Sequence, residues 1–226
     1  MAKILCLDFD DTLVLDNTMR QVMDRFGQPE WNEIGARYDR GELSVEQANA
    51  ACLDLVEAEP EEMREYVREV ARPREGIREL ADWALWNGWL VAVVSNGVDL
   101  YVDPVLDDLG LDRVARHAGR ARKGYRWRVQ YLSPRGVEVQ AGFKLAYAAA
   151  FKNAGDFVVY IGDGASDIEA ARLAPIVFAR DTLWGALKDE HPAIYPFETF
   201  HDVIAVLNAE ADHWLASFSS TTAAEG

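Results

Sequence analysis

The segment KILCLDFDDT (residues 3–12) decides the predicted fold. It starts as a short apolar run, which is typical of a strand buried on both faces, and it ends in a cluster of carboxylates. Comparable apolar runs occur at residues 89–94 (WLVAVV), 157–161 (FVVYI) and, less clearly, 176–179. Helix-like segments separate these runs. Buried strands that alternate with helices indicate a parallel sheet covered on both faces, so we predict a doubly wound α/β fold.

The stretch from residue 15 to residue 72 differs from the rest because it contains no convincing strand. Its apolar residues recur at helical spacing and Gly or Pro residues separate the stripes. The clearest stripe consists of Met63, Tyr66, Val67 and Val70. We predict that residues 15–72, called the insert below, form a small helical domain. Residues 1–14 and 73–226 would form a Rossmann-like α/β core.

A basic segment interrupts an otherwise acidic chain. The formal net charge is −15, yet residues 113–137 hold eight Arg or Lys residues and no Asp or Glu. Residues 125–140 alternate in part around a Ser-Pro-Arg-Gly turn, which predicts a β-hairpin. The basic side chains of residues 113–135 either cover a solvated hairpin or attract an anionic substrate, and the sequence leaves both open.

Composition and charge exclude several classes of protein. Half of the residues are apolar, as in ordinary globular proteins. The negative charge argues against nucleic acid or anionic lipid as a partner. No apolar run approaches the ~20 residues of a membrane helix, and the start lacks a signal-peptide pattern. We expect a cytoplasmic protein, monomeric or homodimeric, with Cys6 and Cys52 unpaired in its core and a frayed tail from Ser217 onward.

Polar residues follow three of the predicted strands. Asp8 and Asp10 follow the first, Ser95-Asn96-Gly97 the second, and GDGASD (residues 162–167) the third. Ligands of such folds collect beyond the carboxyl ends of the strands. Carboxylates favour Mg²⁺, whereas a hydroxyl, an amide and a flexible backbone suit phosphate oxygens. We therefore expect one site at this edge of the sheet.

Each signal also has a purely structural explanation. An Asp at a strand end can cap a turn or helix, and Asn-Gly is a common turn dipeptide. Lys144 lies near a predicted helix start, where a cation opposes the helix dipole. It therefore needs a phosphate or carboxylate partner, unless it is simply exposed. GDGASD lacks the third glycine of a dinucleotide-binding loop, and its acidic residues would repel a pyrophosphate.

The four signals together resemble a known family. DFDDT, Ser95, Lys144 and GDGASD match in order and spacing the motifs of the haloacid dehalogenase-like (HAD) superfamily, and the insert looks like the helical cap of its phosphoserine phosphatase-like branch. PEW, GELS, PREGIREL, VSNGVD, GDGASDIEAARLA and FARD are similar to segments of the methionine-salvage 2-hydroxy-3-keto-5-methylthiopentenyl-1-phosphate phosphatases. Position 11 is Asp where many relatives have Gly, and position 96 is Asn where the salvage enzymes often have Gly.

The resemblance implies a magnesium-dependent phosphatase of a small phosphorylated metabolite. Asp8 would attack phosphorus and form an aspartyl-phosphate. Asp10 would act as general acid and then as general base. Mg²⁺ would be held by Asp8, by the backbone carbonyl of Asp10 and by Asp163. Because dehalogenases of the family lack the second Asp, Asp10 favours phosphate ester hydrolysis.

The remaining roles follow from the same resemblance. Ser95 and Lys144 would bind the phosphate oxygens, and Asp167 would orient Lys144 or act behind the metal ligands. The further substrate-binding candidates are Asp11, Asn96 and Gly97. The insert could read the leaving group through Asn17, Trp31, Arg37 and Tyr38, although each could equally be ordinary surface or core. A phosphoserine phosphatase, another small-metabolite phosphatase and an inactive metabolite-binding protein remain as alternatives.

Overall fold

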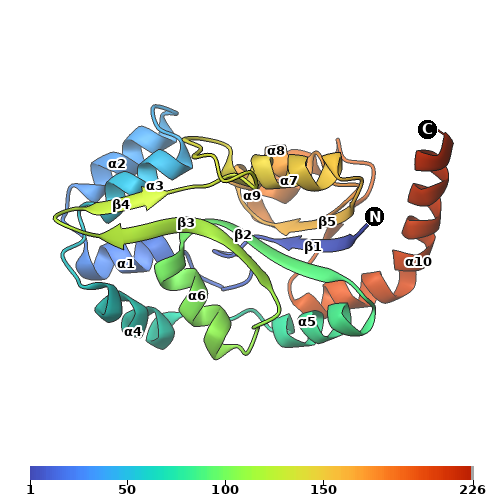
Figure 1. The fold of residues 1–226 in the computed structure, drawn as a ribbon, viewed down its shortest axis with the longest axis horizontal. Helices are drawn as coiled ribbons and strands as arrows, with labels where there is room; N and C mark the ends of the chain where they lie inside the picture. The colour runs from blue at the N-terminus through green and yellow to red at the C-terminus, as the bar shows by residue number, and fades with distance from the viewer. Residues whose placement is uncertain (225–226) are drawn as a thin grey trace.

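A seven-stranded sheet forms the centre of the molecule, in the order β4-β3-β2-β1-β5-β6-β7 (Figure 1). The structure is a computed structural model and describes the backbone of residues 1–224 and the side chains of residues 1–220. The strands are β1 (Lys3–Leu7), β2 (Leu90–Val98), β3 (Ala115–Lys123), β4 (Trp127–Gln130), β5 (Phe157–Gly162), β6 (Ile176–Ala179) and β7 (Ile194–Pro196). Neighbouring strands are parallel except β3 and β4, which are antiparallel.

Helices cover both faces of the sheet (Figure 1). One layer contains α7 (Phe143–Asn153), α8 (Ile168–Ala171) and α9 (Asp181–Leu187), and the other contains α5 (Ile77–Trp86), α6 (Asp99–Asp108) and α10 (Phe200–Ala224). Successive side chains of a strand point to opposite faces. Accordingly, Leu5 and Leu7 of β1 pack in the cluster that contains α5, whereas Ile4 and Cys6 pack in the cluster that contains α7. The predicted doubly wound α/β fold is confirmed.

The insert contributes four helices between β1 and α5. They are α1 (Thr18–Phe26), α2 (Trp31–Asp39), α3 (Val45–Leu53) and α4 (Pro60–Val70). The chain enters and leaves through two adjacent segments, since Val14 and Pro73 form an antiparallel bridge and the N–H of Leu15 donates to the carbonyl of Arg72 at 2.8 Å. We propose residues 15–72 as the cap of a core made of residues 1–14 and 73–226.

The structure has a hairpin that the sequence analysis missed, formed by β3 and β4, and short antiparallel pairing also flanks the predicted Ser-Pro-Arg-Gly turn, where the N–H of Val139 donates to the carbonyl of Tyr131 at 2.8 Å. β3 and β4 pair around residues 124–126, whereas Leu132 and Glu138 share a single isolated bridge around the Ser-Pro-Arg-Gly turn. β3 was missed because its non-basic residues are small rather than large and apolar. At Gly119 the small residue is required by packing, since a Cβ there would lie 2.8 Å from the ring of Tyr131.

The C-terminal prediction is also wrong in its described part. α10 continues from Phe200 to Ala224, so residues 217–224 are helical rather than frayed; residues 225–226 lie outside the described part of the chain. α10 packs on the sheet through Phe200, Val203 and Leu207. No helix within the described residues is long and apolar enough to cross a membrane.

Candidate active site

Three strand ends place the predicted site residues around one cavity. β1 is flanked by β2 and β5, and Leu7 is in register with Val93 of β2 and with Ile161 of β5. The residues that follow these positions therefore meet at the carboxyl edge of the sheet. A cavity of about 280 Å³ lies between this edge and the insert. The predicted residues that line it are Asp8, Asp10, Asp11, Ser95, Asn96, Gly97, Lys144 and Asp163.

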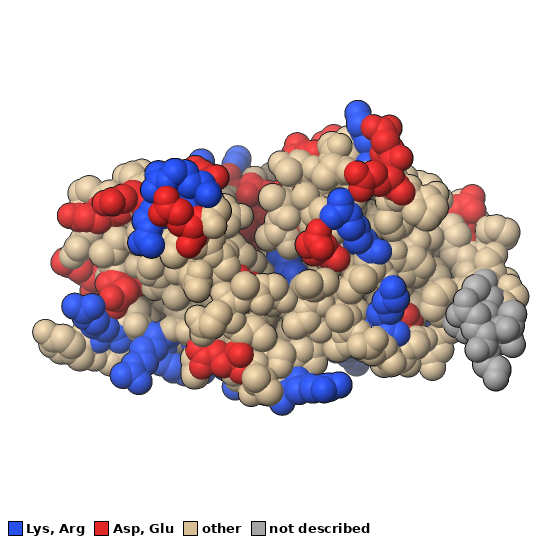
Figure 2. Space-filling model, turned by 90° about the horizontal axis from the view of Figure 1, so that it is seen from above, with Lys and Arg blue, Asp and Glu red and all other residues tan. Residues whose placement is uncertain are grey.

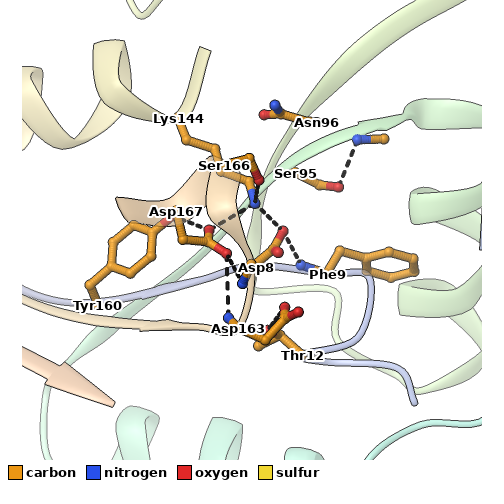
Figure 3. A network of polar contacts seen from close by, with 12 residues as sticks. Asp8, Phe9, Thr12, Ser95, Asn96, Lys144, Tyr160, Asp163, Ser166 and Asp167 are labelled. Carbon is orange, nitrogen blue, oxygen red and sulfur yellow. Dashed lines mark hydrogen bonds and ion pairs between the residues drawn. The ribbon is translucent and has the colours of Figure 1, made fainter. Parts of the chain in front are cut away.

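Lys144 lies between two buried carboxylates (Figure 3). Its Nζ is 2.8 Å from Asp8 Oδ1 and 2.8 Å from Asp167 Oδ1, and all three side chains are nearly inaccessible. Burial by itself would lower the pKa of Lys144, but the Asp167 and Asp8 carboxylates outweigh it and raise that pKa. Burial and Asp167 raise the pKa of Asp8, while Lys144 lowers it. The site thus holds a permanent cation beside the oxygen of Asp8.

Asp167 is fully engaged by its neighbours. Its Oδ1 accepts hydrogen bonds from Lys144 and, at 2.6 Å, from the hydroxyl of Tyr160. Its Oδ2 accepts from the N–H of Gly164 at 2.9 Å. A Cβ at Gly162 would lie 2.8 Å from this carboxyl group. These contacts hold the Asp167 carboxylate against Lys144, and we propose that it orients this lysine.

A cluster of acidic groups suits a divalent cation. Carboxylate oxygens of Asp8, Asp163 and Asp167 lie within 4.8 Å of one another. The Thr12 hydroxyl donates to Asp163 Oδ1 at 2.7 Å. Burial raises the pKa of Asp163 to about 6, and the Asp167 charge adds to this rise. Three carboxylates with one lysine leave excess negative charge, and oxygen donors are what Mg²⁺ prefers. Because Asp167 is committed elsewhere, Asp8 and Asp163 are the side chains that fit the ion.

Asp10 has the properties of a proton donor and acceptor. Its Oδ1 accepts from the N–H of Thr18 at 2.7 Å, at the start of α1. Burial raises its pKa to about 6 despite that hydrogen bond. A carboxyl group with a pKa near neutrality can both give and take a proton. The next residue, Asp11, adopts φ +58°, the left-handed region that glycine occupies most easily.

The last residues of β2 lie under the cavity, although the sequence predicts that this strand ends at residue 94. Ser95 is 1% exposed and its Oγ accepts from the N–H of Gly97 at 2.9 Å. A Cβ at Gly97 would lie 2.5 Å from the ring of Tyr101. The carbonyl of Asn96 accepts from Asn49 Nδ2 at 2.7 Å and from the hydroxyl of Tyr131. Ser95, Asn96 and Gly97 therefore line the cavity, but they lie within β2, where its register with β3 shifts between Val94 and Val98.

The insert covers the cavity with a largely apolar surface. The apolar side chains that line this half are Met19, Met23, Trp31, Val45, Ala48 and Cys52. Of the four predicted cap contacts, Asn17, Trp31 and Tyr38 line the cavity. Arg37 does not, and its Nε lies 3.3 Å from a carboxylate oxygen of Glu42. The insert also contributes one cation to the lining, Arg20.

The basic segment lies outside the cavity. None of residues 113–135, all of which the structure describes, lines it. Several of its cations pair with acids instead, for example Arg116 with Asp107 at 2.6 Å and Lys123 with Glu59 at 2.7 Å. Both colours alternate over the face seen in Figure 2. The observations favour the solvated hairpin over the substrate attractor.

Several contributing residues were missed by sequence reasoning. Arg74 is 6% exposed and donates to the carbonyls of Thr12 at 2.7 Å, Asp11 at 2.6 Å and Glu198 at 2.9 Å. It thereby fixes the loop that follows β1. Tyr160 sits unnoticed inside a predicted strand, and Asn49 on a predicted helix. Two of them belonged to segments that the sequence analysis singled out, Thr12 to DFDDT and Arg74 to PREGIREL, but neither was assigned a role.

Comparison with known proteins assigns the family. The family model for haloacid dehalogenase-like hydrolases matches residues 5–172. The chain belongs to this hydrolase family. The match covers all four motifs, and the resemblance inferred from them is confirmed.

Relatives of this hydrolase span nearly its whole length. It is 28% identical over 209 residues to the 2-hydroxy-3-keto-5-methylthiopentenyl-1-phosphate phosphatase of Bacillus mycoides (strain KBAB4), covering 91% of this chain and 95% of the relative. A solved structure of a substrate-bound phosphoserine phosphatase complex has a TM-score of 0.68 at 23% identity, covering 91% of this chain and 98% of that one. A phospho-aspartyl intermediate analogue of phosphoserine phosphatase has a TM-score of 0.67 at 24% identity, with the same coverage. The hydrolase therefore shares the fold of these phosphatases.

Proposed function

We propose that this hydrolase is a magnesium-dependent phosphatase that cleaves a small phosphate monoester through an aspartyl-phosphate on Asp8. The observation that carries the proposal is the contact between Asp8 and Lys144 on the floor of a covered cavity. A phosphoryl group in transfer is anionic, so catalysis depends on positioning and on positive charge. Lys144 supplies that charge beside the attacking oxygen.

Asp8 and Asp10 act together in both chemical steps. A carboxylate oxygen of Asp8 attacks phosphorus, the bond from phosphorus to the ester oxygen breaks, and Asp10 donates its proton to the departing oxygen. Asp10, now ionised, takes a proton from a water molecule, which attacks the phosphorus of the aspartyl-phosphate. The bond to Asp8 breaks and inorganic phosphate leaves. The pKa of Asp10, raised to about 6 by burial, suits both transfers.

The phosphate oxygens would bind opposite the metal side. Ser95, Asn96, Gly97 and Lys144 line the cavity, and the Ser95 hydroxyl and Lys144 Nζ would donate to the phosphate oxygens. Asp8, Asp163 and the carbonyl of Asp10 would hold Mg²⁺. When bound, the ion would neutralise charge on the transferred group. Asp11 would lie at the edge of the substrate.

The lining of the insert favours an apolar leaving group. Met19, Met23 and Trp31 lie where the substrate tail would sit, and no Asp or Glu of the insert, which the structure describes throughout, lines the cavity. The ammonium group of phosphoserine would find no carboxylate on that side. A thioether tail fits the apolar side chains. We therefore rank 2-hydroxy-3-keto-5-methylthiopentenyl-1-phosphate first and phosphoserine second, as the names of the relatives suggest.

Two measurements test the proposal. Release of phosphate from para-nitrophenyl phosphate should require Mg²⁺ and stop with a chelator. A panel of phosphate monoesters compared by kcat/KM should then favour apolar tails. No turnover of any ester with Mg²⁺ would support the inactive binding protein instead, and a preference for phosphoserine would reverse the ranking of substrates.

The free cysteines bear on the cellular setting that we propose. Cys6 and Cys52 are buried and free, which suits a reducing compartment. We infer a cytoplasmic enzyme that acts on a small metabolite, as a monomer or homodimer, without nucleic acid or membrane partners.

A further inference from the structure

The N-terminus of α7 carries Lys144 but has no side-chain cap of its own. Its N-cap residue is Gly142, with φ +74°, and its first turn holds no acidic residue. The first N–H groups of a helix need acceptors from outside the helix. A cation in the first turn also opposes the helix dipole. Another part of the chain must therefore stabilise this end of α7.

Glu46 of α3 provides the missing acceptor. Its Oε1 accepts a hydrogen bond from the N–H of Phe143 at 2.7 Å, and the residue is 3% exposed. Its Oε2 is buried and has no hydrogen-bond partner among the described residues. Burial of a carboxylate is costly. Burying the Glu46 carboxylate against α7 therefore costs stability. This cost suggests that the carboxylate serves a purpose at the N-terminus of α7.

Two further residues of α3 contact core segments that lead to the phosphate-binding groups. Asn49 lies three positions after Glu46, on the same face of the helix, and donates to the carbonyl of Asn96 at 2.7 Å. Ser44, the N-cap of α3, donates through its hydroxyl to the carbonyl of Gln140 at 2.5 Å. One face of α3 therefore contacts both the last residues of β2 and the segment that enters α7.

We propose that Glu46 is a positioning residue of the phosphatase reaction, which caps α7 from the insert and so holds Lys144 against Asp8. This inference rests on the proposed function. Lys144 directly follows Phe143, so the hydrogen bond acts one residue from the phosphate-binding cation. Asn49 likewise ties α3 to the last residues of β2 through the carbonyl of Asn96. The same contacts that dock α3 on the core thereby also align the phosphate-binding groups.

Substitutions on α3 provide the test. Glu46→Ala should lower kcat/KM by about 10- to 100-fold, because small displacements of a catalytic group are costly. It should also weaken competitive inhibition by inorganic phosphate. Glu46→Gln keeps an oxygen acceptor of the same shape and should stay within about threefold of wild type on the same measure. The matched control is Gln47→Ala, at an exposed residue whose side chain accepts a hydrogen bond from the N–H of Ser44 at the start of α3.

Amide hydrogen exchange provides a second readout that does not depend on activity. Exchange of the backbone amides at residues 143–146 should accelerate in Glu46→Ala but not in Gln47→Ala. If the wild-type protein cleaves no phosphate ester, the proposed function fails, and the exchange experiment still decides whether Glu46 orders α7.

The inference is overturned if Glu46→Ala matches wild type in turnover, if Gln47→Ala loses as much activity, or if Glu46→Gln fails to rescue. If Glu46→Ala does not fold, Asn49→Ala provides the test, because Asn49 is only half-buried and its substitution is easier to tolerate. It should lose about 3- to 10-fold in kcat/KM with a normal melting temperature. Wild-type kinetics in Asn49→Ala would then contradict the coupling between α3 and the site.

Discussion

Asp8 combines two properties that oppose each other, burial and the need to be ionised. It is 6% exposed, and burial together with Asp167 raises its pKa. Lys144 at 2.8 Å and the N–H of Phe9 at 2.7 Å favour the ionised form. Removing the charge should therefore relieve repulsion within the acidic cluster while it removes the nucleophile.

Asp8→Asn tests this residue directly. We expect kcat to fall by at least about 10⁴-fold, as for other lost nucleophiles. The melting temperature should stay equal or rise, because one buried negative charge is gone. Phosphate release and thermal unfolding, followed on the same preparation, check both. Near wild-type turnover by clean protein would assign the nucleophile elsewhere.

Asp10 should matter most for esters with poor leaving groups. An alkoxide needs a proton as it departs, whereas para-nitrophenolate leaves readily without one. We expect Asp10→Asn to lose about 10²- to 10⁴-fold in kcat/KM on alkyl phosphates and clearly less on para-nitrophenyl phosphate. Equal losses on both classes of substrate would argue that Asp10 binds the metal or the loop rather than transferring a proton.

Metal binding should depend on pH through the acidic cluster. The pKa of Asp163 is raised from 3.8 to about 6 in the metal-free fold. The folded state therefore binds this proton more tightly than the unfolded chain, and stability without metal falls as pH rises from about 4 to about 6. Protons also compete with Mg²⁺ for the same oxygen.

We accordingly expect Mg²⁺ to raise the melting temperature more at about pH 7.5 than at about pH 5. Apparent affinity should drop about tenfold at one pH unit below the pKa of a ligand. Melting curves at several Mg²⁺ concentrations measure this, with Asp163→Asn as the control that loses the response. A shift of equal size at both pH values would place the ion away from Asp163.

The segments that join the insert to the core depend on one arginine. Arg74 donates to three carbonyls, of which Asp11 and Thr12 belong to the first motif. Arg74→Met removes the donor of the buried Thr12 carbonyl and of the part-buried Asp11 carbonyl, so we expect a loss of about 2–4 kcal/mol in the free energy of unfolding. Arg72 is the matched control, because it forms an exposed ion pair with Asp16 at 2.5 Å. Arg72→Met should cost about 1 kcal/mol or less.

Urea unfolding of the two variants makes this comparison. A cost for Arg74→Met as small as that for Arg72→Met would show that water replaces the guanidinium. In that case the loop after β1 would be held by backbone contacts alone.

The ends of the first and third predicted strands were predictable from the sequence, whereas side-chain partners were not. Buried parallel strands read as apolar runs, so the pattern was enough to place Asp8 and Asp163 beyond β1 and β5. It ended the second strand too early, because the polar residues Ser95 and Asn96 belong to β2, which continues to Val98. β3 escaped because its residues are small or basic. α6 escaped because it contains Pro104, a residue that usually ends a helix.

Long-range hydrogen bonds mark the limit of such reasoning. Arg74 and Glu46 act on residues 62 and 97 positions away along the chain. Nothing in the local pattern of either residue specifies that partner, because an Arg or Glu on a helix or turn is normally solvated. The partners of these supporting polar residues could therefore be identified only from the three-dimensional structure.

The insert and the core share one continuous hydrophobic cluster. Val22, Leu53 and Val67 of the insert belong to the same cluster of buried side chains as Leu100 and Leu106 of α6. The insert is also linked to the hairpin, since Trp127 Nε1 donates to the carbonyl of Val56 at 3.0 Å. The shared cluster therefore crosses the boundary between the two parts, whereas the cluster on the α7 side of the sheet contains no residue of the insert.

This continuity predicts that insert and core unfold together. Opening the insert alone would expose the α6 side of the shared cluster, at roughly 25 cal/mol per Å² of apolar surface. We expect one cooperative transition, with coincident curves from tryptophan fluorescence and far-ultraviolet circular dichroism and with equal calorimetric and van't Hoff enthalpies. Trp31 reports on the insert, and Trp31→Phe identifies its part of the signal. An earlier transition confined to Trp31 would show that the insert melts by itself, and the shared cluster would then be too weak to couple the two parts.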